Sequence, residues 1–192
     1  MSVLVLLVMG YMEKVLAYDS QISSDEAKSV IQKRVEETIR VLKKKDFKHL
    51  SRLVHPDKGL RLSGSFLYKE GVVLKRHEIP KLMGDKKKFI PVAIGETGDS
   101  ENWPFDDYFV RYVYDRDYSN APEIDFNRRI NRGSEGNNLF EFFPGAIIVE
   151  YHFPELDPQK NGRDWRSLYL VYEKADDSKW YLVDIAHAEK TE

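Results

Sequence analysis

Two histidines and a glutamate in the last third of the chain are the strongest candidates for acid–base chemistry. Glu150 and His152 are two residues apart on a predicted strand, so their side chains share one face. His187 is in phase with Val183 and Ile185 on a later strand. A His–carboxylate pair in a cavity could transfer a proton on a small carbonyl compound. The alternative, which we favour, is that these groups are satisfied internally and fix strand register or a subunit contact.

A second candidate pair, His55 and Asp57, lies at the end of a predicted short helix. Pro56 drives the residue before it out of the helical region, and Asp57-Lys58-Gly59 is typical of a turn. The pair could form a catalytic dyad or contact a ligand. We favour a structural turn, in which His55 meets free helix carbonyls and Asp57 braces the chain. This interpretation predicts that Asp57→Ala lowers the melting temperature.

Aromatic side chains supply the remaining candidates for ligand contact. Of 24 aromatic residues, 18 lie at or after Trp103, so the last part of the chain must bury a large apolar surface. We expect Tyr151, Trp165 and Tyr169 to lie nearest a ligand. An aromatic stripe on a sheet is most often core. A homodimer contact through this face is the next interpretation, and a carbohydrate- or peptide-binding surface is the third.

The residue types also exclude several kinds of chemistry. The chain has no cysteine, which rules out disulfides, thiolate nucleophiles and cysteine-ligated zinc. Asp115-Arg116-Asp117 begins like a calcium loop, but Asn120 and Phe126 stand where that loop needs glycine and a bidentate glutamate. Arg116 instead predicts local charge balance. We expect no metal and no cofactor.

The charge balance bears on the partner. Thirty Lys and Arg against 32 Asp and Glu give a net charge of -2, which lacks the basic excess that a nucleic-acid partner requires. The triplets Lys43-Lys44-Lys45 and Lys86-Lys87-Lys88 have no interleaved aromatics and are expected to be solvated. We therefore expect no nucleic acid, and a small molecule or a protein as the partner.

These candidates must be positioned by helices first and strands afterwards. Ser23-Ser24-Asp25-Glu26 reads as a capping box for a long helix. Its apolar stripe consists of Ala27, Val30, Ile31, Val35, Ile39 and Leu42. A shorter helix follows Asp46 and stops near His55. Strands are predicted around 60–66 and at 72–74, 89–94, 124–130, 146–153, 165–173 and 180–187, a polar turn at 97–102, and a helix after Pro104.

This order predicts the α+β class, with N-terminal helices packed on a curved, mainly antiparallel sheet. Alternation along the last strand places Tyr181, Val183, Ile185 and His187 on one face and Trp180, Leu182 and Asp184 on the other. Both faces of the sheet carry large apolar groups. The helices can cover one face, so a second layer or another subunit must cover the other.

The N-terminus carries an apolar run from Val3 to Met9, too short to span a bilayer but as long as the core of an export signal. We divide the chain into an export signal or N-terminal segment at 1–20 and a single domain at 21–192. The expected location is extracytoplasmic. A cytoplasmic location is the alternative, because no Lys or Arg precedes the run and Glu13-Lys14 follow it.

Five stretches together carry a family resemblance. They are Val54-His55-Pro56-Asp57-Lys58-Gly59, Tyr112-Val113-Tyr114-Asp115 with Asp117-Tyr118, Val149-Glu150-Tyr151-His152-Phe153-Pro154, Asp164-Trp165-Arg166-Ser167-Leu168 and Lys179-Trp180-Tyr181-Leu182-Val183. From about Ser23 to His187 the chain resembles a family of uncharacterised bacterial proteins, often exported or lipid-anchored. Their fold is the α+β cone of nuclear transport factor two and the cystatin-like proteins. The chain departs from that family in lacking the lipid-acceptor cysteine and an acidic residue and tryptophan just after His187.

The resemblance implies a long helix over a curved sheet, with a pocket between the 27–42 helix and the C-terminal strands. Relatives of this architecture include ketosteroid isomerase, scytalone dehydratase, polyketide cyclases and many non-catalytic binding modules, so the fold alone does not decide the function. We expect a non-catalytic binding or interaction module. The alternatives are a small cofactor-independent isomerase, dehydratase or cyclase that uses the His–carboxylate pair, and a structural dimer whose cone is filled by side chains.

Overall fold

The long N-terminal helix begins where the capping signal predicts. The computed structural model describes residues 22–63, 71–94, 99–128, 139–155, 157–160 and 164–190, and its first helix, α2 (Ser24–Lys43), has the Ser23 hydroxyl accepting from the Glu26 amide at 3.3 Å. The predicted apolar stripe is buried except for Val30, which is 51 % exposed. Ile31 takes the inward position beside Ala27, so the prediction for Val30 was wrong. The predicted segment at 1–20 lies outside the described residues.

A short second helix turns the chain toward the sheet. α3 (Phe47–Leu53) is capped by the Asp46 carboxylate, which accepts from the His49 amide at 2.9 Å. Its last residue is Leu53, and the C-cap residue Val54 has an extended backbone, in agreement with the expected stop near His55. The 54–59 turn then leads into the first strand.

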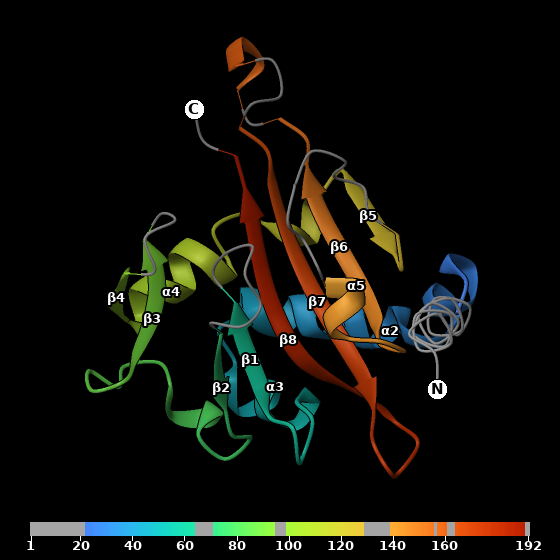
Figure 1. Ribbon diagram of the computed structural model, residues 1–192, viewed down its shortest axis with the longest axis horizontal. Helices are drawn as coiled ribbons and strands as arrows, with labels where there is room; N and C mark the ends of the chain where they lie inside the picture. The colour runs from blue at the N-terminus through green and yellow to red at the C-terminus, as the bar shows by residue number, and fades with distance from the viewer. Residues whose placement is uncertain are drawn as a thin grey trace, which may run out of the picture.

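Six strands form one curved, open sheet, shown in Figure 1 with α2 behind it and α5 in front. The sheet order is β2-β1-β8-β7-β6-β5, and only the β1–β8 pair is parallel. The strands are β1 (Leu60–Ser63), β2 (Val72–Leu74), β5 (Glu123–Phe126), β6 (Ile147–Phe153), β7 (Arg166–Lys174) and β8 (Trp180–Glu189). The α+β class and the mainly antiparallel, curved sheet are confirmed.

The remaining elements lie beside or across this sheet. A separate hairpin pairs β3 (Phe89–Ile94) with β4 (Asp99–Pro104), so the polar turn predicted at 97–102 was wrong from residue 99 onward. Apolar and polar residues do not alternate along β4, and such alternation is the pattern from which a strand is predicted. β4 forms because its backbone pairs with β3. The other short elements are η2 (Ile79–Lys81), α4 (Phe105–Tyr108), the π-helical turn η3 (Phe109–Val113), η4 (Tyr118–Asn120), α5 (Leu139–Phe142) and η5 (Pro158–Lys160).

The sheet is buried on both faces, and each face has its own core. The helix-covered face packs Ile147, Val149, Tyr151, Leu168, Leu170 and Tyr172 against α2, α3 and α4. The opposite face, called the α5 face, packs Ile148, Trp165, Tyr169, Val171, Val183 and Ala186 against Leu139 and Phe143. The expectation that a second layer would cover the aromatic face is therefore met by the chain itself, through α5 and the residue just after it.

A β-bulge in β8 changes which side chains share a face. Val171 pairs with Asp184 while Tyr172 pairs with Leu182, so Val183 is the extra residue. Leu182 and Ile185 therefore both enter the helix-side core, and Val183 lies on the α5 face. Strict alternation along this strand was wrong, because it places Leu182 opposite Ile185 and groups Val183 with Ile185.

The interior between helices and sheet is filled. The hollow bounded there by Leu42, Phe47, Leu62, Phe105, Phe109 and Ile185, among others, measures only about 10 Å³. α2 contributes its buried stripe to the same cluster as Tyr151 and Tyr172, and the Tyr172 hydroxyl donates to Thr38 at 2.9 Å. A volume this small is about that of one water molecule. This hollow, which α2 lines only through Leu42, is thus too small for a ligand.

Candidate functional site

Glu150 lies at the centre of a hydrogen-bonded group on the α5 face. Its side chain is 0 % exposed, and its Oε1 atom accepts from the Ser167 hydroxyl at 2.8 Å and the Tyr169 hydroxyl at 2.9 Å. Because Ser167 donates to Glu150, its oxygen is free to accept from His152 Nδ1, 2.7 Å away. Burial lowers the pKa of His152, although the charge of Glu150, 3.9 Å away, opposes the shift. These side chains satisfy one another across β6 and β7.

His187 belongs to a different group, on the helix-covered side of β8. Its Nε2 atom lies 3.6 Å from Asp115 Oδ2, and its ring lies edge-on to Tyr112. Burial alone would raise the pKa of Asp115, but His187, the Tyr118 hydroxyl and Arg166 together hold it below its usual range. Two buried nitrogens in this part of the chain, His187 Nε2 and Arg166 Nε, have no partner at hydrogen-bond geometry.

Charge pairs extend this second group to the end of β8. Arg166 Nε lies 3.3 Å from Asp115 and 3.0 Å from Glu189. The Nη1 and Nη2 atoms of Arg111 donate to the same Glu189 carboxylate. Burial raises the pKa of Glu189, but Arg111, His187 and Arg166 outweigh it and lower the pKa. Asp117 instead pairs with Lys43 at 2.7 Å. The predicted balance by Arg116 was wrong, since residues from other elements neutralise both aspartates.

The two histidine–carboxylate pairs therefore lie on opposite faces of the sheet. His152 is with Glu150 under α5, and His187 is with Asp115 beside η3. All four side chains are buried or nearly so. None of the hollows described below is lined by any of them. The structure does not bring Glu150 and His187 together.

His55, rather than Asp57, braces the 54–59 turn. The His55 ring is buried, and its Nδ1 atom accepts from the amides of Asp57 and Lys58, both at 3.2 Å. Its ring also meets Tyr181 edge-on. The Asp57 side chain is exposed and makes no hydrogen bond with the described residues. The bracing role that the sequence assigned to Asp57 was therefore wrong.

We expect His55→Ala to destabilise the protein more than Asp57→Ala. Loss of His55 leaves two amides without their acceptor, which costs about 1–3 kcal/mol, whereas an exposed carboxylate costs less than about 0.5 kcal/mol. For a chain of this length that corresponds to a drop in melting temperature of roughly 2–10 °C for His55→Ala. Differential scanning calorimetry measures both variants. Equal melting temperatures would contradict the assignment.

The aromatic candidates do not converge on one place. Tyr151 lies in the helix-side core, while Trp165 and Tyr169 lie on the α5 face. Trp165 and Tyr169 are already buried within a single chain. A homodimer through this face stays a prediction, but these aromatic side chains need no second subunit to cover them.

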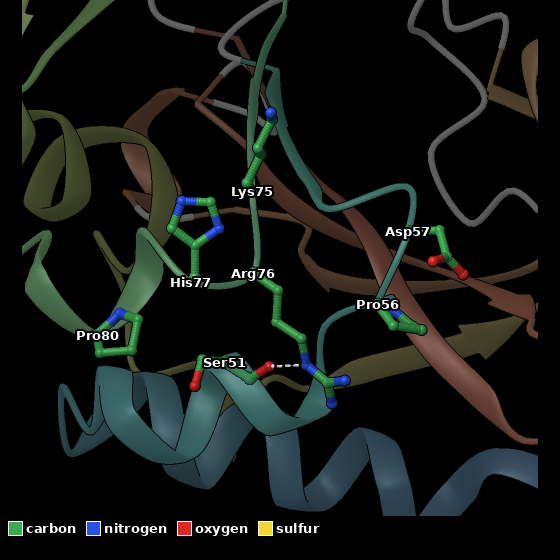
Figure 2. A pocket seen from close by; sticks show the side chains of 7 residues that line it. All are labelled: Ser51, Pro56, Asp57, Lys75, Arg76, His77 and Pro80. Atoms are coloured by element: carbon green, nitrogen blue, oxygen red, sulfur yellow. Dashed lines mark hydrogen bonds between the residues drawn. The ribbon is translucent and has the colours of Figure 1, made fainter.

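The largest hollow among those described lies on the outer surface near α3. It measures about 580 Å³ and is open to solvent (Figure 2). Its lining comes from three segments, α3, the 54–59 turn and the chain from β2 to η2, and consists of Ser51, Pro56, Asp57, Lys75, Arg76, His77 and Pro80. We call it the α3–η2 hollow. Of the residues predicted to bind a ligand, only Asp57 lines it.

Arg76 fixes one wall of this hollow. Its Nε atom donates to the Ser51 carbonyl and its Nη2 atom to the Arg52 carbonyl, both at 2.7 Å, so it satisfies carbonyls at the end of α3. Its guanidinium also stacks over Tyr181 at 5.5 Å. Figure 2 shows Arg76 between Pro80 and His77 on one side and Pro56 and Asp57 on the other. The wall is therefore rigid without a ligand.

Two smaller hollows are less promising. One, of about 430 Å³, is a shallow surface beside Trp103, Glu101 and Asp107, where the indole already donates to Glu101. The other, of about 220 Å³, lies beside Phe142 and Val183, with Lys58 and Glu173 paired at 2.6 Å across it. In each hollow, two of the polar lining groups are thus engaged with one another.

Asp184, next to the bulge, is a buried carboxyl outside both histidine groups. It is 0 % exposed and accepts from the Ser63 hydroxyl at 3.2 and 3.3 Å. Burial raises its pKa well above the usual range, and the charge of Arg61 and the Ser63 hydroxyl offset only part of that shift. A group of this kind is most stable in its protonated form.

We expect Asp184 to make the protein less stable as the pH rises. A pKa raised by folding gives stability that is complete below the unfolded pKa and is lost as the pH approaches the folded value. Asp184→Asn keeps an uncharged acceptor for Ser63. The free energy of unfolding of Asp184→Asn should equal that of the wild type near pH 4 and exceed it by about 1–3 kcal/mol at pH 8. Urea unfolding across this range gives the difference curve, and a flat difference would contradict the assignment.

The comparisons with known proteins add no name. No family model, no curated protein and no solved structure matches the chain. Within the described segments, no three His, Asp or Glu side chains could hold a metal ion together. Among the helices that the structure describes, none is long and apolar enough to cross a membrane. The family resemblance stays a prediction.

The motifs in the sequence did not indicate the α3–η2 hollow, but the distribution of charge along the chain does. Residues 43–88 contain 14 Lys and Arg against 5 Asp and Glu, whereas residues 89–192 contain 11 against 21. The near-neutral total hides this separation. A charge count along the chain, rather than over the whole chain, singles out the segment that lines the hollow.

Proposed function

We propose that this chain is a non-catalytic binding module whose ligand occupies the α3–η2 hollow. The observation that carries the proposal is the contrast in free space. The interior hollow beside Leu42 and Phe47 holds about 10 Å³, while the α3–η2 hollow holds about 580 Å³, within the range of small-ligand sites. The proposal keeps the expected class of function and moves its site from the interior to the outer surface.

The rigidity of the hollow supports this function. Arg76 is held by two carbonyls of α3, and the neighbouring turn is held by His55. A site whose walls are already ordered loses little conformational entropy when a ligand arrives. A surface depression between mobile side chains lacks this advantage.

The catalytic alternative has weaker support. An isomerase, dehydratase or cyclase of the expected kind needs a histidine and a carboxylate that reach the same substrate atoms. Here Glu150 and His187 are on opposite faces, and each is engaged with other side chains or buried beside them. The structural alternative, a dimer with a filled cone, agrees with the packed interior but gives the α3–η2 hollow no role.

We also propose that the fold is the cone of the nuclear-transport-factor-two-like and cystatin-like proteins. The long helix α2 across one face of a curved sheet supports this assignment. An export signal at 1–20 and an extracytoplasmic location remain part of the proposal. N-terminal sequencing of the protein recovered from its native cells would identify the cleavage site, and an intact Met1 would count against it.

An NMR titration tests whether the hollow binds small molecules. Acetate, imidazole and phenol, added separately to the full ¹⁵N-labelled chain, should shift the amides of Ser51, Lys75 and His77 for at least one probe. Pro80→Trp should abolish these shifts because the indole fills the hollow. Pro122→Trp, at an exposed proline before β5, is the matched control. Shifts that are absent for all probes, or unchanged in Pro80→Trp, would overturn the proposal.

A further inference from the structure

The lining of the α3–η2 hollow carries an excess of positive charge. Lys75, Arg76 and His77 are consecutive and all line it, against a single carboxylate, that of Asp57. Figure 2 shows His77 and Asp57 on opposite sides of Arg76, with Lys75 pointing away from the Arg76 guanidinium. The basic end of the hollow is therefore available to a negatively charged group.

Three neighbouring acids are engaged with groups outside the lining or with backbone amides. Glu78 follows His77 in the chain, but its carboxylate accepts from the Lys75 amide at 2.6 Å and from Lys88 Nζ at 3.1 Å. The hydrogen bond from the Lys75 amide lowers the pKa of Glu78 first, and Lys88 lowers it further. Asp46 caps α3. Asp85 accepts from the Lys87 amide. Glu78, Asp46 and Asp85 thus have local partners.

Arg76 keeps one nitrogen that is not used within the described residues. Its Nε and Nη2 atoms are used at the end of α3, while Nη1 makes no hydrogen bond with the described residues. A guanidinium held by two hydrogen bonds and an aromatic face is already oriented for an oxyanion. Lys75 and His77 are exposed and can close on the anion from the rim.

The surrounding segment would draw an anion toward this place. Basic residues of the elements that build the hollow include Lys48 and Arg52 in α3, Lys58 in the turn, and Lys75, Arg76 and Lys81 in the chain from β2 to η2. A basic patch around a concave site raises the local concentration of anions and the association rate, and salt weakens both effects.

We infer that the ligand of the α3–η2 hollow is a small molecule bearing a phosphate or carboxylate group, held by Arg76 with Lys75 and His77. This inference rests on the proposed binding function and adds the ligand's chemistry. The anionic group lies at the basic end. Asp57, at the other end, accepts a hydrogen bond from a hydroxyl or amine of the same ligand. A small ligand is favoured over an extended polyanion because the hollow is bounded and its opposite end is acidic.

The test compares inorganic phosphate, acetate and glycerol as NMR probes of the full chain at low salt. Phosphate or acetate should shift the amides of Ser51 and 75–77, and the stronger of the two identifies the anionic group. Glycerol, which is uncharged, should not. Lys75→Gln should weaken anion binding about tenfold, as loss of one charge-assisted contact does, and His77→Gln should weaken it through the loss of one hydrogen bond. Raising the salt should weaken it as well.

Controls separate this inference from the proposed function. Lys160→Gln removes an exposed lysine far along the chain in η5 and should leave binding unchanged. Arg76 is left intact because its loss would also loosen α3. If imidazole or phenol binds in the hollow but neither anion does, the inference is wrong and the binding function stands. Anion binding unaffected by Lys75→Gln and His77→Gln, or binding of a 20-nucleotide DNA strand with no response to either anion, would also overturn the inference.

Discussion

Arg166→Met should lower the free energy of unfolding by about 3–5 kcal/mol, because it breaks up a nearly buried group of charges. Arg166 lies between Asp115 and Glu189, at 3.3 and 3.0 Å. Its removal leaves both carboxylates with less compensation in a partly desolvated position. Asp115 would then keep His187, 3.6 Å away, as a neighbouring group that can carry a positive charge.

The matched control for this change is Arg128→Met. Arg128 also pairs with an aspartate, Asp125 at 3.1 Å, but its side chain is 72 % exposed. An exposed pair contributes less than about 1 kcal/mol. Urea unfolding at pH 7 should therefore separate the two variants by at least about 2 kcal/mol. The gap should narrow at low pH, since Asp115 and Glu189 have lowered pKa values and their stabilising charge is lost as they take up protons. Equal losses would show that the buried cluster is not structural.

Glu150→Ala should destabilise the protein by a similar amount, about 3–5 kcal/mol. The change removes the acceptor shared by the hydroxyls of Ser167 and Tyr169 and leaves a void under α5. His152, which bonds to Ser167, loses its link to the same group. A catalytic glutamate would behave differently, because removing a reactive carboxylate from an active site often leaves stability unchanged or raises it.

Glu123→Ala is the control for Glu150. Glu123 is exposed on the adjacent strand β5 and is paired in register with His152. Its loss should change the free energy of unfolding by less than about 0.5 kcal/mol. Chemical denaturation of both variants provides the comparison. A Glu150→Ala variant as stable as the wild type would favour the enzyme alternative over a structural role.

Local sequence signals predicted the elements that are determined locally. The capping serine and the apolar stripe placed α2 to within a residue at its start, and β-rich runs placed β6, β7 and β8. The same signals did not predict features whose structure is determined by contacts between residues far apart in the sequence. The bulge at Val183 depends on how β7 and β8 pair, and β4 depends on its partner β3.

The candidate site was harder to predict than the fold. The bulge lies between Val171 and Tyr172 on one strand and Leu182 and Asp184 on the other, and alternation cannot reveal it. His187 and Glu150 lie on opposite faces of the sheet because of the way their strands pair. The sequence of a single strand does not determine which of its two faces lies on which side of the sheet. The α3–η2 hollow forms only where three segments meet in the fold. The sequence suggested Asp57 as a ligand-binding residue from its turn motif, but nothing local to Arg76 indicated that it lines the same hollow.

The most direct test of this account is where a small anion perturbs the protein. Inorganic phosphate or acetate, titrated separately into the ¹⁵N-labelled wild-type chain, should shift the amides of Ser51, Lys75 and His77 and leave those of Ala27 and Tyr151, which are buried between α2 and the sheet, in place. Shifts centred on Ala27 and Tyr151 would contradict it, because they would show that the ligand enters between α2 and the sheet after all.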